Sequence, residues 1–122
     1  MGLIGKIIVS LMPIAPKFLV KRIAGRYVAG LNLESAIDLM KSMSKENTCF
    51  TIDVLGEDIN DVDEARYFVD EYSRVLDSIV SNQLDANISL KPTALGLLID
   101  KEVALSNIEE IMEKAALNDI FV

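Results

Sequence analysis

The fold of this chain is decided by the stretch TCFTIDVLGE, residues 48–57. It predicts a buried β-strand, because most of its residues are apolar and several are β-branched or aromatic. The lone cysteine, Cys49, is expected inside this buried run, and Gly56 ends it. A strand that is apolar on both faces is typical of a parallel sheet covered by helices on both sides. We therefore expect an α/β fold built outward from this strand.

One charged residue, Asp53, interrupts the apolar run. An ionised carboxylate in a buried strand is costly unless a partner or a polar cavity meets it. Asp53 is therefore either a structural residue, satisfied by a neighbouring donor at the strand end, or part of an active site at the carboxyl end of the strand. Its position alone leaves both interpretations open.

Length and composition limit the chain to one domain at most. Of its 122 residues, 51% are hydrophobic, and the mean hydropathy is +0.32, which is high for a small soluble domain. This predicts that further protein or a membrane surface covers part of the chain. The net charge of −7 argues against nucleic acid as a partner.

Missing residue types exclude several kinds of site. The chain has no histidine, which excludes Ser-His and Cys-His catalysis and histidine-ligated metals. Its single cysteine permits no disulfide within the chain, as expected in a reducing compartment. The CxxC, P-loop and GxGxxG motifs do not occur either. We therefore predict a cytoplasmic protein without a metal site.

Residues 1–31 are expected to form an amino-terminal helical segment. Its apolar part, residues 2–15, is shorter than the roughly 20 residues that a membrane-spanning helix needs. A second helix is predicted over 16–29, with Pro16 in its first turn. Because residues 1–30 carry five basic side chains and no acidic one, residues 1–29 either pack as an ordinary helical segment or contact anionic lipid at a membrane surface.

From residue 32 onward, the apolar spacing alternates between the helical and the strand period. It predicts helices over 33–44, 61–82 and 100–117, and strands over 48–57, 86–90 and 120–122. Asn32 and Asp61 are suitable N-caps, and Glu64 completes a capping box after Asp61. The inward stripes of the two longer helices are expected to be Ala65, Phe68, Val69, Tyr72, Leu76, Ile79 and Val80, and then Leu105, Ile108, Ile111, Met112 and Ala115.

Leading helices followed by β-α-β-α-β define the predicted fold class. Connections of this length between buried strands form right-handed parallel crossovers. The repeat of roughly 35–40 residues matches one βα unit of a TIM-type barrel. We therefore interpret residues 32–122 as the first part of a (βα)8 barrel domain that is cut short, because three strands alone leave open edges and an uncovered apolar face.

Two polar residues, Asp53 and Lys91, follow or end two neighbouring strands of this predicted sheet. The carboxyl ends of the strands carry the active site in such barrels. A carboxylate and an ammonium group meeting there could form a structural ion pair, each making the charge of the other tolerable. Alternatively, Asp53 could meet the nitrogen of a cationic amine substrate. Composition does not separate these hypotheses.

Four segments in order resemble one enzyme family. They are RYVAG (26–30), TIDVLGE (51–57), ISLKPTALGL (88–97) and IFV (120–122). In sequence and spacing they resemble the amino-terminal part of bacterial and archaeal proline dehydrogenase, from about residue 16 to residue 122. The resemblance implies a flavin-dependent (βα)8 barrel that oxidises L-proline to 1-pyrroline-5-carboxylate, passes hydride to FAD and delivers electrons to a membrane quinone.

The resemblance also implies roles for particular residues. Asp53 matches the family carboxylate that contacts the proline ring nitrogen, and Lys91 matches a supporting lysine at the next strand end. Lys17 and Lys21 are both candidates for the family lysine near the flavin. The family continues with further strands that carry the arginine pair for the proline carboxylate and most of the flavin surface, and this chain ends before them.

The missing strands lead to three hypotheses about function. The chain alone is expected to be inactive, with proline oxidation residing in a complete barrel. It could instead be a non-catalytic interaction fragment that forms a homo-oligomer through its open sheet, because large uncovered apolar faces mark association sites. A third hypothesis is peripheral association with the inner face of the membrane through residues 1–29.

Overall fold

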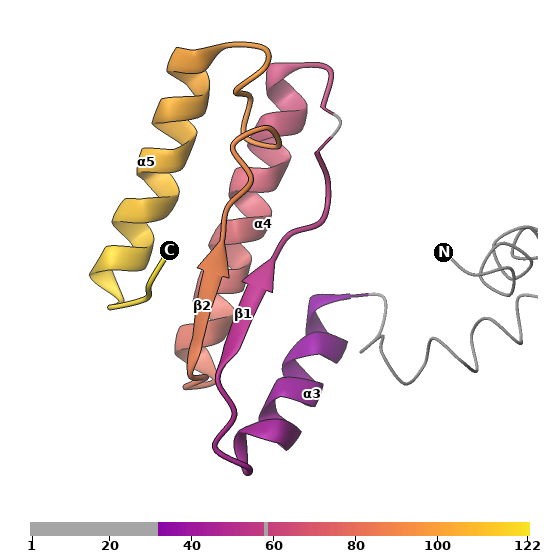
Figure 1. Ribbon diagram of the computed structural model, residues 1–122, viewed down its shortest axis with the longest axis vertical. Coiled ribbons are helices and arrows are strands. Elements are labelled where there is room, and N and C mark those ends of the chain that lie inside the picture. The colour runs from indigo at the N-terminus through magenta and orange to yellow at the C-terminus, as the bar shows by residue number, and fades with distance from the viewer. Residues whose placement is uncertain (1–31, 58) are drawn as a thin grey trace, which may run out of the picture. The chain divides into compact units, whose positions relative to one another are not determined.

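The computed structural model describes residues 32–57 and 59–122 (Figure 1). Residues 37–122 form one compact unit. The predicted helix over 16–29, the proposed lipid-contacting segment 1–29 and the two lysines Lys17 and Lys21 lie outside the described residues. The predicted division into an amino-terminal segment 1–31 and a domain 32–122 stays a prediction.

Helices and strands follow one another in the predicted order. They are α3 (Leu33–Ser44), β1 (Phe50–Asp53), α4 (Val62–Ser81), β2 (Ala86–Ser89) and α5 (Lys101–Leu117). Each helix begins and ends within one residue of its predicted bounds, whereas β1 is much shorter than the run 48–57. The chain after β2 makes a series of turns before α5. The α/β class is thus confirmed, with three helices and two strands among the described residues.

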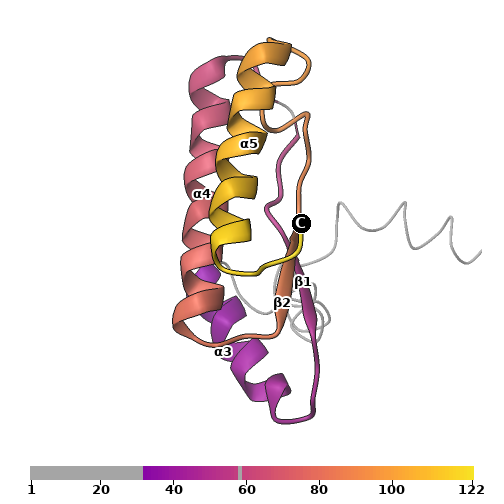
Figure 2. The ribbon, with the colours of Figure 1, turned by 90° about the vertical axis from the view of Figure 1, so that its left-hand side faces the viewer.

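The two strands form a parallel sheet in which Phe50 pairs with Ala86 and Asp53 with Ser89. The helices α4 and α5 lie together on one face of this sheet (Figure 2). In Figure 1 these helices lie behind the strands and β2 lies to the left of β1, so the crossover through α4 is right-handed, as predicted.

The prediction that residues 48–57 are buried on both faces is wrong. Exposure alternates along β1, and Thr51 and Asp53 are exposed. Cys49 is exposed as well, and the side chain of Leu55 is 86% exposed. The physical reason is that α4 and α5 cover only one face of the sheet, so alternate side chains point away from them.

A third strand is not formed by residues 120–122, contrary to the prediction. The segment lies beside β2 all the same, because the backbone N–H of Ile88 donates to the carbonyl oxygen of Phe121 at 3.2 Å. A segment of this length makes too few ladder bonds to be a regular strand. The predicted order of strands is consistent with this contact, which lies on the side of β2 away from β1.

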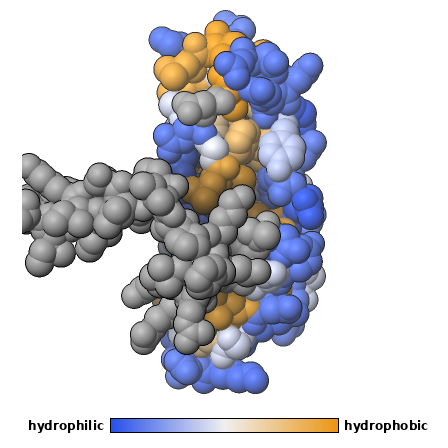
Figure 3. All heavy atoms as spheres, turned by 90° about the vertical axis from the view of Figure 1, so that its right-hand side faces the viewer, coloured by the Kyte–Doolittle hydropathy of each residue, from blue (hydrophilic) through white to orange (hydrophobic). Residues whose placement is uncertain are grey.

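The core lies between the sheet and the two helices. Tyr72, Leu76 and Val69 of α4 are among its largest fully buried side chains, together with Leu95 of the turns after β2. The predicted inward stripe of α4 is confirmed except at Val80, whereas only Ile111 and Ala115 of the five residues predicted for α5 are buried. Val80, Leu105 and Met112 are 46%, 57% and 50% exposed, because the helices meet the sheet along narrower faces than the sequence pattern predicts. Figure 3 shows apolar surface, in orange, among the hydrophilic residues.

Ion pairs join α4 to α5 along their exposed edges. A guanidinium nitrogen of Arg66 lies 2.6 Å from a carboxylate oxygen of Glu110, and Lys114 lies 2.6 Å from Asp77. The hydrogen bond to Glu110 is the main cause that raises the pKa of Arg66, and it lowers the pKa of Glu110. These pairs are largely exposed, so each adds little to stability.

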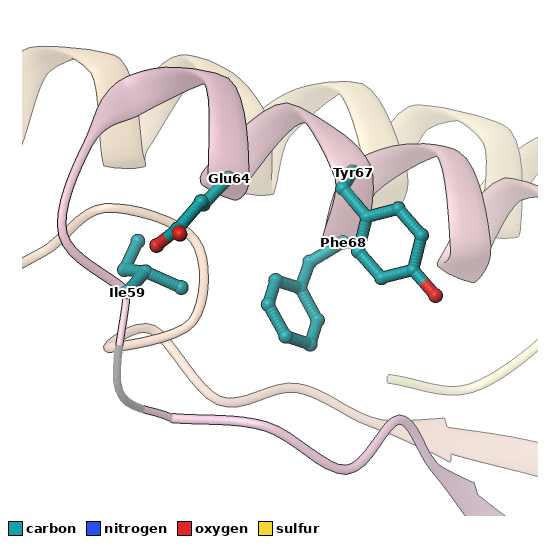
Figure 4. Close-up of a pocket in the computed structure, with 4 residues that line it drawn as sticks. All are labelled: Ile59, Glu64, Tyr67 and Phe68. Carbon is teal, nitrogen blue, oxygen red and sulfur yellow. The ribbon is translucent and has the colours of Figure 1, made fainter.

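The predicted capping box at the start of α4 is present with one change. The Asp61 side chain accepts a hydrogen bond from the Glu64 backbone N–H at 2.9 Å. The Glu64 carboxylate accepts from the backbone N–H of Asn60 at 2.6 Å, one residue before the cap. Figure 4 shows this glutamate beside an open hollow of about 300 Å³, which is lined by Ile59, Glu64, Tyr67 and Phe68.

Among the described helices, none combines the length and the apolar character that crossing a membrane requires.

Candidate active site

Asp53 is the last residue of β1 and pairs in register with Ser89, the last residue of β2. Residues paired directly across a parallel sheet point to the same face. Asp53 lies on the face opposite Ile52 and Ile88, whose side chains point toward the helices, where Ile88 is only 2% exposed. The carboxylate therefore stands at the carboxyl edge of the sheet, on the face that α4 and α5 leave open.

Lys91 follows β2 by two residues and reaches back to the same point. Its Nζ donates a short hydrogen bond to Oδ2 of Asp53, and it lies 3.7 Å from an oxygen of Glu57. The side chains of Lys91 and Asp53 are 25% and 33% exposed, so water still reaches the pair. The hydrogen bond that Lys91 donates to Asp53 raises the pKa of Lys91, and the negative charges of Asp53 and Glu57 add to this. The two predicted site residues are thus brought into direct contact.

A third side chain, Tyr72 of α4, joins this pair from the helix layer. Its hydroxyl lies 2.8 Å from the carbonyl oxygen of Ser89 and 3.4 Å from Oδ1 of Asp53. Because a phenol has one hydrogen, it donates mainly to the nearer oxygen of Ser89. Burial is the main cause that raises the pKa of Tyr72, and the charge of Asp53 contributes, while the backbone N–H of Val54 lowers it.

Sequence reasoning missed the polar role of Tyr72 and the position of Glu57. From the sequence, Tyr72 is expected only as one member of the apolar stripe of α4. Its chemistry gave a usable signal, because a buried tyrosine normally finds a partner for its hydroxyl. Glu57 gave no such signal, since it follows the glycine that ends the predicted strand and belongs to an ordinary polar loop. Only the fold brings its carboxylate within 3.7 Å of Lys91.

This arrangement can bind and orient a cation. Asp53 places two carboxylate oxygens at the edge of the sheet. Oδ2 accepts a hydrogen bond from the ammonium group of Lys91, and Oδ1 faces the Tyr72 hydroxyl. A carboxylate so placed favours a positive charge on a nearby nitrogen. The hollow of Figure 4, and a second one of about 400 Å³ beside Glu113, Ala116 and Leu117, do not include Asp53 or Lys91.

Comparison with known proteins identifies relatives of one kind. The chain is 36% identical over 99 residues to proline dehydrogenase 1 of Bacillus subtilis subsp. natto, an alignment that covers 81% of this chain and 33% of that protein. Proline dehydrogenase 2 of Bacillus subtilis strain 168 is 30% identical over the same shares. The proline dehydrogenase of Deinococcus radiodurans is 26% identical over 96 residues, covering 76% of this chain and 31% of that protein.

The chain spans about a third of the length of the curated relatives it matches. No protein-family model matches it. All of these relatives are proline dehydrogenases, and an alignment over 99 of the 122 residues must include residues 24–99, and therefore both Asp53 and Lys91. By sequence, the chain is therefore related to the proline dehydrogenase family, and it matches about a third of the length of those proteins.

Proposed function

We propose that this chain contributes the amine-binding part of a proline dehydrogenase, which oxidises L-proline to 1-pyrroline-5-carboxylate. The observation that carries the proposal is the position of Asp53. Its carboxylate stands at the carboxyl end of the first strand of a parallel α/β unit, beside Lys91 and on the open face of the sheet. That edge is where barrel enzymes hold their substrates, and the relatives are named for proline.

Asp53 has a direct role in this proposal. Proline carries a positively charged ring nitrogen at neutral pH, and its product contains a carbon–nitrogen double bond. A carboxylate beside that nitrogen fixes the orientation of the ring and stabilises positive charge as the double bond forms. Lys91 acts as a supporting residue that holds the Asp53 carboxylate in place before the substrate arrives.

The family relationship implies FAD as the hydride acceptor. The described residues do not fit a flavin site by themselves, because the one cationic group at the strand edge, Lys91, is already paired with Asp53 and lies 3.7 Å from Glu57. A flavin dinucleotide needs several donors for its phosphates. We therefore assign its binding surface to other parts of the complete protein.

The same proposal includes the barrel fold, the electron acceptor and the cellular location that the family resemblance implies. The described unit would be the first portion of a (βα)8 barrel, and the chain by itself would be inactive. Quinone would accept the electrons, with a cytoplasmic protein touching the inner face of the membrane through residues 1–29. The exposed side chains of Leu55, Leu98 and Phe121, which are 86%, 81% and 77% exposed, are consistent with a unit that further protein covers.

A chimeric enzyme tests this proposal. The matched third of the Bacillus subtilis relative would be replaced by residues of this chain, and proline-dependent dye reduction would be measured. We expect activity, and a fall in kcat/KM of roughly a hundredfold in Asp53→Asn, the size of effect typical for removing one preorganised electrostatic contact. Asp85→Asn is the matched control, because this exposed aspartate precedes β2 at the opposite end of the sheet.

Two results would contradict the proposal. An active chimera whose Asp53→Asn variant keeps the full rate would remove Asp53 from the site. Proline-dependent dye reduction by the purified 122-residue chain would show that the chain is not inactive alone.

A further inference from the structure

The carboxylate that we assign to the substrate amine already carries a cation. Lys91 Nζ is hydrogen-bonded to Oδ2 of Asp53, and Tyr72 stands at Oδ1. A substrate nitrogen approaching Asp53 therefore meets an occupied carboxylate. Either the amine binds the same carboxylate beside an ammonium group of the same sign, which is unfavourable at so short a separation, or Lys91 moves away.

The cluster offers Lys91 a second acceptor. The carboxylate of Glu57 lies 3.7 Å from the same Nζ, on the loop that follows β1. Its side chain is 62% exposed, so it can adjust its position toward Lys91 at little cost. The ammonium group can thus exchange one carboxylate for the other by a small rotation of its flexible side chain.

Formal charge favours this exchange once a second cation is present. Asp53 and Glu57 carry two negative charges, Lys91 carries one positive charge, and the neighbouring Tyr72 is neutral. The cluster is therefore short of one positive charge. A substrate ammonium on Asp53, with Lys91 on Glu57, gives two ion pairs, whereas in the present arrangement Lys91 alone serves both carboxylates.

We propose, on the basis of the function proposed above, that Lys91 occupies the position on Asp53 that the substrate ammonium takes and moves to Glu57 when the substrate binds. Lys91 is then an internal competitor that keeps the carboxylate in place and admits only ligands with a positive charge of their own. Glu57 becomes a specificity-determining residue, because it lowers the free energy needed to move Lys91 away from Asp53. Tyr72 keeps its contact with Ser89 throughout and holds the end of the strand while the cation at Oδ2 changes.

The exchange makes opposite predictions for two variants. Removing Lys91 should tighten binding of a cyclic ammonium ion, since nothing has to be displaced from Asp53. Removing the charge of Glu57 should weaken it, since displaced Lys91 loses its acceptor. Two residues with only structural roles would both weaken binding when replaced, so the difference in sign identifies the exchange.

The test is a titration of the 122-residue chain with pyrrolidinium chloride, followed by the ¹³C NMR signals of the Asp53 carboxylate and the Lys91 side chain. Sodium chloride at equal ionic strength and the uncharged ring tetrahydrofuran are the reference titrations. We expect Lys91→Met to lower the apparent Kd about two- to fivefold and Glu57→Gln to raise it about two- to fivefold, the range of an exposed ion pair. Lys101→Met, at the exposed start of α5, should leave the Kd unchanged.

Several outcomes would overturn the exchange. These are a Kd that does not fall in Lys91→Met, a Kd that does not rise in Glu57→Gln, binding that survives Asp53→Asn, or no saturable binding in any variant. A parallel titration with L-proline separates this proposal from the proposed function. If the Kd for pyrrolidinium changes as expected in both variants and L-proline does not bind, the exchange is supported and L-proline is excluded as the ligand. If neither binds, the exchange fails, and the chimera still decides the proposed function.

Discussion

The hydroxyl of Tyr72 donates to the carbonyl oxygen of Ser89 at 2.8 Å and so ties the helix layer to the carboxyl end of β2. Tyr72 is fully buried, and Ser89 is the register partner of Asp53. One side chain therefore connects α4 with both strand ends that hold the candidate site. This explains how a sheet of only two short strands keeps a fixed carboxyl edge.

Tyr72→Phe should loosen that edge without opening a cavity. The ring still fills the core, but the carbonyl of Ser89 loses its donor, which we expect to lower the free energy of unfolding by about 1 kcal/mol. Urea denaturation measures this loss, and hydrogen exchange should be faster at the ends of β1 and β2. Tyr67→Phe on the same helix is the control, because the Tyr67 side chain is 60% exposed. Equal stability of the two variants would show that the Ser89 contact does not stabilise the fold.

Alkaline pH should destabilise the unit through Lys91 and Tyr72, since folding raises the pKa of both groups. The unfolded chain then loses these protons first, so the folded state binds more protons, and stability falls as pH rises. The contribution is fully present below the ordinary values of about 10 and is lost as pH rises through the raised values. Chemical denaturation between about pH 9 and 12, a range that brackets the ordinary values of about 10, measures the slope. A double variant, Lys91→Met with Tyr72→Phe, should flatten it, and an unchanged slope would contradict the assignment.

Gly56→Ala should be the more damaging of two glycine substitutions. Gly56 has φ +146°, and an added Cβ would lie 2.6 Å from Cε1 of the Phe68 ring and still closer to Cζ. Backbone strain and overpacking together should lower the free energy of unfolding by about 2 kcal/mol or more. Gly96 has φ +106°, but the nearest atom to an added Cβ is 3.7 Å away. Gly96→Ala should therefore cost about 1 kcal/mol, from strain alone.

The glycine comparison is made by urea denaturation of the two variants side by side. Equal losses would show that the Phe68 ring moves aside freely. A smaller loss from Gly56→Ala in a Phe68→Leu background than in the wild-type background would identify the clash with the ring as the cause.

Asn107→Leu should unfold the turns after β2 before the rest of the unit. Asn107 is 9% exposed, and its Nδ2 donates to the carbonyl oxygen of Leu95 at 3.0 Å. Leucine leaves that carbonyl buried without its donor, at a cost of about 1–3 kcal/mol. Hydrogen exchange should rise at residues 94–100 more than in α4. Asn118→Leu is the control, because Asn118 is exposed and bonds only the last turn of its own helix.

The sequence by itself determined the order of the elements. The apolar periods set the helices, and Asp61 and Glu64 set the start of α4, because capping depends on neighbours within one turn. It also predicted that Asp53 and Lys91 lie at the same edge of the sheet, since parallel strands bring their carboxyl ends together, and it left open whether they pair. These features follow from local patterns and from one topological rule.

Only the tertiary structure decided which faces are covered and what surrounds Asp53. The apolar pattern of residues 48–57 predicts burial on both faces, but two helices cover one face only, and Cys49 and Leu55 remain exposed. Tyr72 and Glu57 join the site from positions 19 residues after and four residues after Asp53, through contacts that no short-range pattern encodes. The physical reason is that burial and pairing depend on which elements meet in space, and spacing along the chain does not fix that.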